Sequence, residues 1–261
     1  MNRYIGIFDS GIGGLSVVKA LTELAPNENV VYFGDTLNMP YGDKSIEEIK
    51  NLIFHDVDIL LEYELKAIVI ACGTASSIAA ETLRQSYDLP IFDVIYPAAR
   101  QAVSSSRNKK IGIIATKATV ASKSFENAIH NISREIETFA IGCPKLANMI
   151  ENGHFSSKDI ELVRLLNEYL EPLKQANIDT LILGCTHYHL LIDVLHELMP
   201  GVNLVSSSAC EAQAVYDYLK ENRLLCDAGH EHKYLVSADP EGFSKIVSNF
   251  MKLDGPVLLK Q

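Results

Sequence analysis

The sequence predicts an α/β fold divided into two domains. Short runs rich in β-branched residues alternate with longer segments of helical period, as in parallel strands joined by crossover helices. After a polar stretch at residues 104–110, the pattern starts again. Residues 67–74 and 180–187 also resemble each other, since each reads as a strand, a small residue, a cysteine and a polar turn into a helix. Two similar halves would explain this repeat, and a chain of 261 residues is long enough for two domains.

The first half opens with a strand over residues 4–8. A glycine-rich turn at residues 11–14 leads into a helix whose leucine and valine side chains recur on one face, and Pro26 ends this helix. A second strand is predicted over residues 30–33. The next segment, residues 46–63, has the period of a long amphipathic helix. The first half therefore begins as strand, helix, strand and helix.

Later strands have the continuously apolar character of buried parallel sheets, most clearly at residues 67–71. Residues 88–93 introduce a further strand, and residues 111–116 open the second half. The segment from about Ser208 is expected to be helical and to end in an amphipathic run over residues 241–251. On pattern alone this segment fits either half.

The composition excludes several classes of protein. With 48% hydrophobic and 21% charged residues the chain can bury a sizeable core, so disorder, collagen and coiled coil are excluded. The net charge of −10 disfavours binding to nucleic acid or to an anionic membrane. No run approaches the ~20 apolar residues of a membrane span, and the N-terminus lacks the apolar region of a signal peptide. Five cysteines without a C-x-x-C motif indicate free thiols in a reducing cytoplasm.

Polar residues follow the ends of three predicted strands: Asp9-Ser10, Cys72-Gly73-Thr74 and Cys185-Thr186-His187. Ligands of open α/β sheets bind beyond the carboxyl ends of the strands. A thiol at a helix N-terminus feels the positive end of the helix dipole, so we expect a lowered pKa and a thiolate at Cys72 and Cys185. One such cysteine alone is more often a packing residue. Two at equivalent positions of two halves favour a pair of bases or nucleophiles.

Other interpretations of these residues stay open. Asp9 ends an apolar strand, where a carboxylate is costly unless it caps the next helix or meets a partner. His187 could be satisfied within its own turn, although it lies within reach of the same cavity as Cys185. The glycine-rich residues 9–14 do not fit the dinucleotide or Walker patterns, so no phosphate site is expected there. Thiolate, imidazole and carboxylate are all zinc ligands, which leaves a non-catalytic zinc or thiol-binding protein as an alternative. Its ligands would be Cys72, Cys185, His187 and Asp9.

Four ordered blocks, residues 6–17, 32–42, 71–76 and 183–188, resemble the signature of bacterial glutamate racemases, within the aspartate/glutamate racemase superfamily. The resemblance extends from residue 5 to about residue 255. It implies an isomerase that makes D-glutamate for peptidoglycan without pyridoxal phosphate or metal. It also implies two pseudosymmetric domains, each a mainly parallel sheet flanked by helices, with the active site in the cleft between them. The implied division is 1–97 plus 208–261 for one domain and 98–207 for the other.

The resemblance also assigns roles to individual residues. It makes Cys72 and Cys185 the two acid–base catalysts, with Asp9 and His187 as their polar supports. Glu151 resembles the additional acidic residue that the family places near this histidine. The implied substrate-binding residues are Asp9, Ser10, Tyr41, Gly42, Gly73, Thr74, Thr116, Thr186 and His187.

Three residues depart from the family pattern. Gly73 stands where most members have Asn, His189 replaces the usual Pro, and Ser206 stands where Asp is common. The first departure removes a side-chain hydrogen bond to the substrate, so Gly73→Asn is expected to lower the KM for glutamate. It also keeps open a different amino acid, such as aspartate, as the substrate. The other two departures are expected to be structural variation.

Both lines of reasoning predict a two-base mechanism. Inversion of an α-carbon requires removal of a proton on one face and return of a proton on the other, which two facing cysteines provide. The family analogy assigns removal of the proton from L-glutamate to Cys185 and from D-glutamate to Cys72. The expected partner is this small substrate, with no nucleic acid, membrane or cofactor, and a homodimer stays open. Because only a few residues precede the first predicted strand, we expect no activation by a cell-wall precursor of the kind seen in some relatives.

Overall fold

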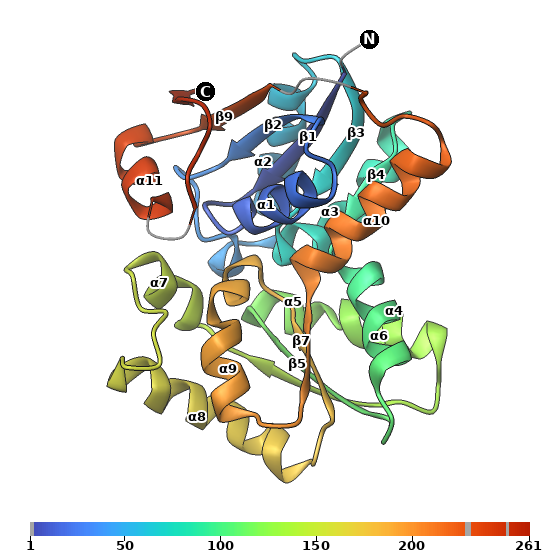
Figure 1. Ribbon diagram of the computed structural model, residues 1–261, viewed down its shortest axis with the longest axis vertical. Coiled ribbons are helices and arrows are strands. Elements are labelled where there is room, and N and C mark those ends of the chain that lie inside the picture. The colour runs from blue at the N-terminus through green and yellow to red at the C-terminus, as the bar shows by residue number, and fades with distance from the viewer. Residues whose placement is uncertain (1–2, 228–230, 249–250) are drawn as a thin grey trace.

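The computed structural model describes residues 3–227, 231–248 and 251–261. Within these ranges it contains two sheets, one above the other in Figure 1. The strands of the first sheet run in the order β10-β9-β2-β1-β3-β4, and those of the second in the order β6-β5-β7-β8. All paired strands are parallel. The predicted α/β class, with parallel sheets flanked by helices, is therefore confirmed.

The first sheet is covered by helices on both faces. Its strands are β1 (Tyr4–Asp9), β2 (Asn29–Gly34), β3 (Leu65–Ile70), β4 (Ile91–Asp93), β9 (His232–Val236) and β10 (Val257–Leu259). One face packs on α1 (Leu15–Leu24), α10 (Ser207–Glu221) and α11 (Pro240–Val247), the other on α2 (Ile46–Leu60) and α3 (Gly73–Ser86). In β1, Ile5 and Ile7 point to the first of these layers and Phe8 to the second, as the alternation of a strand requires.

The second sheet has the same layered construction. Its strands are β5 (Lys110–Ala115), β6 (Glu137–Gly142), β7 (Thr180–Leu183) and β8 (Asn203–Ser206). One face packs on α4 (Ile95–Ser105) and α6 (Ser124–Ile132). The other face packs on α7 (Leu146–Glu151), α8 (Ile160–Gln175) and α9 (Ile192–Leu198). Each sheet thus has its own two-sided core, so two sheets fit two domains.

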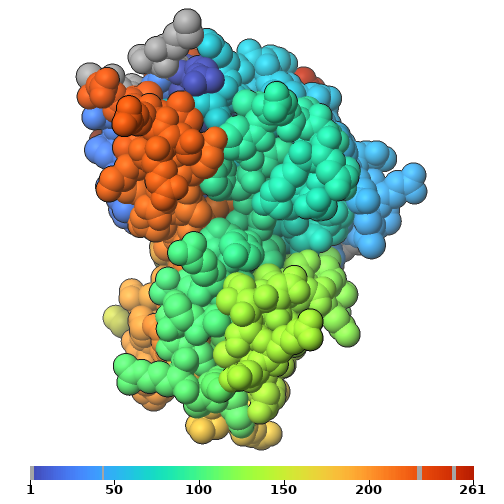
Figure 2. Space-filling view, turned by 90° about the vertical axis from the view of Figure 1, so that its right-hand side faces the viewer, coloured from blue at the N-terminus to red at the C-terminus, as the bar shows by residue number. Residues whose placement is uncertain are grey.

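The chain passes between the two halves twice. It enters the second half through α4 and returns through α10, which begins at Ser207 directly after β8 and packs on α1. Figure 2 shows α4 in green against α10 in orange at the waist between the halves. Beyond α10, β9 pairs with β2 and β10 pairs with β9, so both strands lie in the first sheet. The domain boundaries at residues 97 and 208 stay a prediction.

Side-chain caps fix where several helices begin. Ser45 accepts a hydrogen bond from the backbone N–H of Glu48 at the start of α2, and Ser206 accepts one from Ala209 at the start of α10. Such caps satisfy donors that the first helical turn leaves free. Thr116 caps the short helix α5 (Lys117–Ser122) in the same way. Ser206, a departure from the family pattern, therefore has a structural role.

Several element boundaries differ from the sequence prediction. The helix predicted to reach residue 63 ends at Leu60, because the chain turns at residues 61–63 to enter β3. The amphipathic run 241–251 is helical over Pro240–Val247, and residues 249–250 lie outside the described part of the chain. No helix in the described ranges combines the length and apolar character needed to cross a membrane.

Candidate active site

The carboxyl ends of β1, β3, β5 and β7 lead to one cavity between the two halves. Its lining residues are Ser10, Pro40, Tyr41, Gly42, Cys72, Gly73, Thr74, Thr116, Ala147, Glu151, Gly184, Cys185, Thr186 and His187. Every residue predicted for the site lines this cavity except Asp9, which lies buried next to it. The cavity measures about 30 Å³, room for about two water molecules. The two halves are therefore closed on each other.

Cys72 occupies the N-cap position of α3, directly after β3. Its Sγ lies 3.6 Å from the Ser10 hydroxyl oxygen. Burial and the neighbouring carboxylate of Asp9 raise the pKa of the Cys72 thiol to about 12, although backbone and Ser10 hydrogen bonds oppose this shift. The expected lowering of the pKa is therefore wrong for Cys72, because the helix N-terminus is outweighed by burial beside an acidic group.

Cys185 occupies the equivalent position after β7, at the start of the 3-10 helix η2 (Thr186–Leu191). Its Sγ lies 3.6 Å from His187 Nδ1. His187 Nε2 lies 2.9 Å from Glu151 Oε1, an ion-pair contact that is not an aligned hydrogen bond. Burial would lower the pKa of His187, but its contacts with Cys185 and Glu151 outweigh burial and raise that pKa well above the usual value. The imidazole is therefore held as a cation beside the Cys185 sulfur.

Asp9 links the two halves beneath the cavity. Its Oδ1 accepts a hydrogen bond from the Gly11 N–H at 2.9 Å, and its Oδ2 accepts one from the Thr186 hydroxyl at 3.3 Å. Burial raises the pKa of Asp9, while the charge of His187 and these hydrogen bonds lower it in part. Asp9 thus orders the turn after β1, and also reaches across to the Cys185 turn.

Threonine hydroxyls form a second link across the cavity. Thr74 Oγ1 lies 3.0 Å from Thr116 Oγ1, and Thr116 Oγ1 lies 2.9 Å from Thr119 Oγ1. Thr74 belongs to the first half and Thr116 to the second. The hydroxyl groups therefore supply hydrogen-bond donors and acceptors from both sides of the site.

Glycines permit the close approach of the halves. A Cβ on Gly73 would lie 2.4 Å from the backbone oxygen of Gly184, and one on Gly13 would lie 2.6 Å from His187 Nδ1. Contacts this short do not occur for real Cβ atoms, and the Gly184 backbone would have to move. A side chain at residue 73 would therefore require the Gly184 backbone to shift in this closed arrangement, and the expected effect of Gly73→Asn on the KM for glutamate stays a prediction.

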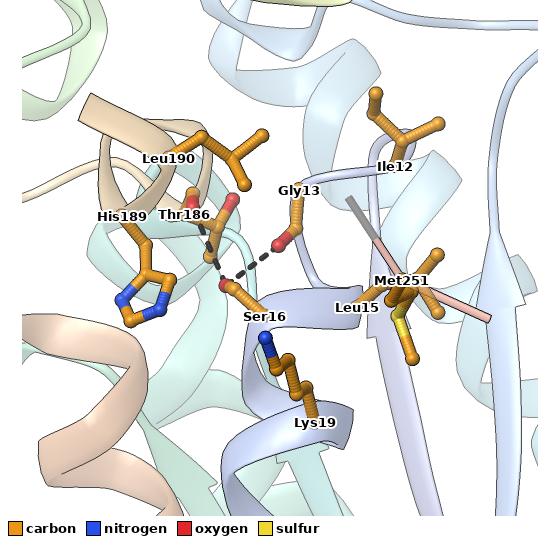
Figure 3. A pocket seen from close by; sticks show the side chains of 9 residues that line it. All are labelled: Ile12, Gly13, Leu15, Ser16, Lys19, Thr186, His189, Leu190 and Met251. Atoms are coloured by element: carbon orange, nitrogen blue, oxygen red, sulfur yellow. Dashed lines mark hydrogen bonds between the residues drawn. The ribbon is translucent and has the colours of Figure 1, made fainter. Parts of the chain in front are cut away.

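A smaller pocket lies beside the cysteine cavity, on the α1 side. Figure 3 shows Ser16 there, with its hydroxyl at 2.7 Å from the Gly13 carbonyl and 3.3 Å from the Thr186 carbonyl. His189 lines the same pocket, and its Nδ1 lies 3.0 Å from the Ser206 hydroxyl. His189 and Ser206, two departures from the family pattern, therefore contact each other. This pairing agrees with the expectation of structural variation.

The sequence interpretation missed three residues of the cavity wall. Gly184 carried a signal, since it is the small residue before the cysteine in the repeat. Pro40 carried one as well, since it stands directly before the predicted Tyr41 and Gly42 in the block of residues 32–42. Ala147 carried none, because only the tertiary arrangement brings it to the site. In the described parts of the chain, no three His, Cys, Asp or Glu side chains are placed to hold a metal ion. The zinc alternative therefore lacks a ligand set in these residues.

Residues 5–215 match the profile of the Asp/Glu/Hydantoin racemase family. The chain therefore belongs to this family, and it is an isomerase of the racemase class.

Named relatives give a closer assignment. The chain is 38% identical over 257 residues to the glutamate racemase of Exiguobacterium sibiricum, an alignment that covers 96% of this chain and 93% of the relative. The crystal structure of a glutamate racemase isoform from Bacillus anthracis matches with a TM-score of 0.95 and 32% identity, over 99% of this chain and 97% of that one. The structure of the Francisella tularensis glutamate racemase in complex with D-glutamate matches with a TM-score of 0.92 and 34% identity, over 100% of this chain and 98% of that one. The resemblance to glutamate racemases is therefore confirmed.

Proposed function

We propose that the protein interconverts L-glutamate and D-glutamate with Cys72 and Cys185 as its two bases. One observation carries the proposal: the two thiols follow equivalent strands of the two halves and line the same cavity. The relatives named glutamate racemase, which align over most of both chains, support glutamate as the substrate. On the same ground we propose that the D-glutamate supplies peptidoglycan synthesis and that the reaction takes place in the cytoplasm.

The environments of the two cysteines suggest their starting states. A cationic His187, 3.6 Å from the Cys185 sulfur, favours negative charge there, whereas the raised pKa of Cys72 keeps its thiol protonated. The Cys185 thiolate then takes the α-proton of L-glutamate, and the Cys72 thiol donates its proton to the opposite face. When the product D-glutamate leaves, Cys185 is a thiol and Cys72 is a thiolate. In the reverse reaction Cys72 removes the α-proton and Cys185 donates one. Assignment of each cysteine to one enantiomer rests on the resemblance.

Hydroxyl groups of the cavity wall suit an anionic substrate. Removal of the α-proton places negative charge on the α-carboxylate, which Ser10, Thr74 and Thr186 could stabilise by hydrogen bonds in a site closed to water. Such local dipoles are needed because the net charge of −10 opposes the approach of glutamate. A cavity of about 30 Å³ also requires the halves to separate before glutamate enters.

Circular dichroism of the substrate tests the proposal. Purified protein, dialysed against a chelator and free of pyridoxal phosphate, is incubated with each enantiomer of glutamate and of aspartate. We expect the signals of L- and D-glutamate to decay to zero while those of aspartate persist. If only the aspartate signals decay, the substrate is aspartate and not glutamate. Unchanged signals from all four amino acids would refute racemase activity on both. Homodimer formation stays a prediction, which sedimentation of the same sample tests.

A further inference from the structure

A buried group of two carboxyls and one phenol lies behind the wall of the cavity. Tyr41 Oη lies 2.7 Å from Asp35 Oδ2 and 2.7 Å from Asp56 Oδ2. All three side chains are buried, with 1% of Tyr41, 2% of Asp35 and none of Asp56 exposed. None of the three takes part in the two-base chemistry.

The number of protons in this group is limited. A phenol has one proton and can donate it to one carboxylate only, yet Tyr41 Oη contacts both carboxyl groups at hydrogen-bond distance. Two ionised carboxylates on one phenol oxygen would leave one contact without a proton and two negative charges close together in a dry interior. A second proton therefore lies on one of the two carboxyl groups.

The hydrogen-bond partners of Asp35 and Asp56 determine which of the two carboxyl groups carries the second proton. Asp35 Oδ1 accepts hydrogen bonds from the Ser237 hydroxyl at 2.7 Å and from Asn38 Nδ2 at 3.0 Å. Asp35 Oδ1 therefore acts as a hydrogen-bond acceptor towards two donors. Among the residues that the structure describes, Asp56 forms a hydrogen-bond contact with Tyr41 alone, and its Oδ1 has no partner. Asp56 therefore carries the proton and donates it to Tyr41, which in turn donates its own proton to Asp35.

The surrounding charges favour the same assignment. Burial raises the pKa of Asp56 well above its usual value, and the charges of Asp35 and Asp9 raise it further, while the Tyr41 hydrogen bond offsets part of the rise. The charge of Asp56 also contributes to the raised pKa of Tyr32, which lies on the other face of the sheet and stays a neutral phenol. The charges that act on Asp56 are thus acidic, and they oppose its ionisation.

This chain of hydrogen bonds leads to the active site. Tyr41 lines the cysteine cavity, and the following Gly42 faces Thr116 of the other half, so that a Cβ on Gly42 would lie 3.5 Å from Thr116 Cβ. The Asp35 backbone N–H donates to the Asp9 carbonyl at 3.0 Å, which joins the group to the turn after β1. Displacement of Tyr41 would therefore alter the cavity wall that binds the substrate.

We propose that Asp56 is a positioning residue, held as a neutral acid that donates a hydrogen bond to Tyr41 and so fixes this part of the glutamate site. The activity part of this inference rests on the proposed function. Ionisation of Asp56 at alkaline pH removes its hydrogen bond to Tyr41. Tyr41 is then no longer held in place and the KM for glutamate rises, while the chemical step at the two thiols is affected less.

Three variants test the inference, with steady-state kinetics for glutamate at about pH 7 and pH 9. Asp56→Asn keeps a neutral donor of the same shape, so we expect a KM within about twofold of wild type at pH 7 and no selective rise at pH 9. Asp56→Leu removes the donor, and we expect a KM about tenfold higher with kcat within about threefold. Asp58→Asn, an exposed acid on the same helix, serves as the matched control.

Thermal unfolding of Asp56→Asn gives a readout that does not need activity. An acid whose pKa is raised by folding contributes stability that is complete below the unfolded pKa of ~3.9 and is lost as the pH rises towards the folded pKa. The Tm of Asp56→Asn minus that of wild type should therefore grow between about pH 5 and pH 9, and should be compared with the same difference for the exposed Asp58→Asn. A constant or shrinking difference for Asp56→Asn, or a KM for it as high as that of Asp56→Leu, would overturn the inference. Inactive wild-type protein with a growing Tm difference would refute the proposed function and leave the neutral acid supported.

Discussion

The Cα of Gly73 faces the carbonyl oxygen of Gly184 across the cleft so closely that a Cβ on Gly73 would lie 2.4 Å from that oxygen. Gly73 begins α3 in the first half, and Gly184 precedes Cys185 in the second. In this arrangement a side chain at residue 73 would require the Gly184 backbone, and with it the turn that carries Cys185, to shift.

Gly73→Ala should therefore impair closure. Overpacking costs about 1–3 kcal/mol, which corresponds to a loss in kcat/KM of about fivefold or more when the closed form is the reactive one. Kinetics of glutamate racemisation measure the loss. Gly142→Ala is the matched control, since its Cβ would meet only ordinary contacts, the nearest 3.4 Å away on the Lys117 side chain. Wild-type kinetics for Gly73→Ala would show that this close approach is not needed.

Single serine variants of the two cysteines should separate the two proton transfers. A hydroxyl cannot replace a thiol as a base near neutrality, so Cys72→Ser and Cys185→Ser should each abolish racemisation of glutamate. Elimination from a glutamate analogue with a leaving group on the β-carbon needs only one base. Cys72→Ser should eliminate from the L form and Cys185→Ser from the D form, as followed by release of the product. If both variants process both enantiomers equally, the two-base assignment is wrong.

The elimination reaction that uses Cys72 should depend strongly on pH. With a Cys72 pKa of about 12, the thiolate fraction rises about tenfold per pH unit throughout the neutral range. The rate of Cys185→Ser on the D analogue should therefore climb steeply between about pH 7 and pH 9. A flat initial-rate profile over this range would contradict a raised pKa of the Cys72 thiol.

A buried ion pair ties the C-terminal segment to the first sheet. Lys66 pairs with Glu28, with 3% and 1% of the side chains exposed, and its ammonium donates to the Leu224 carbonyl at 2.7 Å. Lys66→Met leaves a buried carboxylate unpaired and should lower the free energy of unfolding by about 3–5 kcal/mol in urea titrations.

The chain offers a control for this prediction in the exposed pair Lys260–Glu62. Lys260→Met should cost much less than Lys66→Met, because water screens an exposed pair. Adding Glu28→Leu to Lys66→Met should recover most of the lost stability, since no unpaired charge then remains. Equal costs for Lys66→Met and Lys260→Met would argue against a buried pair at Lys66.

The sequence was informative where structure and chemistry depend on local pattern. The turns at Cys72 and Cys185 could be predicted because an apolar strand, a small residue and a polar turn stand together in the chain. Pairing of β9 with β2 could not, because Val30 meets His232 only in the folded protein. The pKa of Cys72 was mispredicted for the same reason, since it depends on burial beside Asp9, a residue far away in the sequence.

The return of the chain to the first sheet has a consequence for synthesis on the ribosome. The strands of the second sheet lie within residues 110–206 and leave the ribosome one after another. By contrast, β2 gains its partner strand β9 only after His232–Val236 have been synthesised. We therefore expect the second sheet to be completed before the first sheet during translation. A nascent chain that stalls before β9 leaves the apolar β2 as an open edge, a template for pairing with another chain.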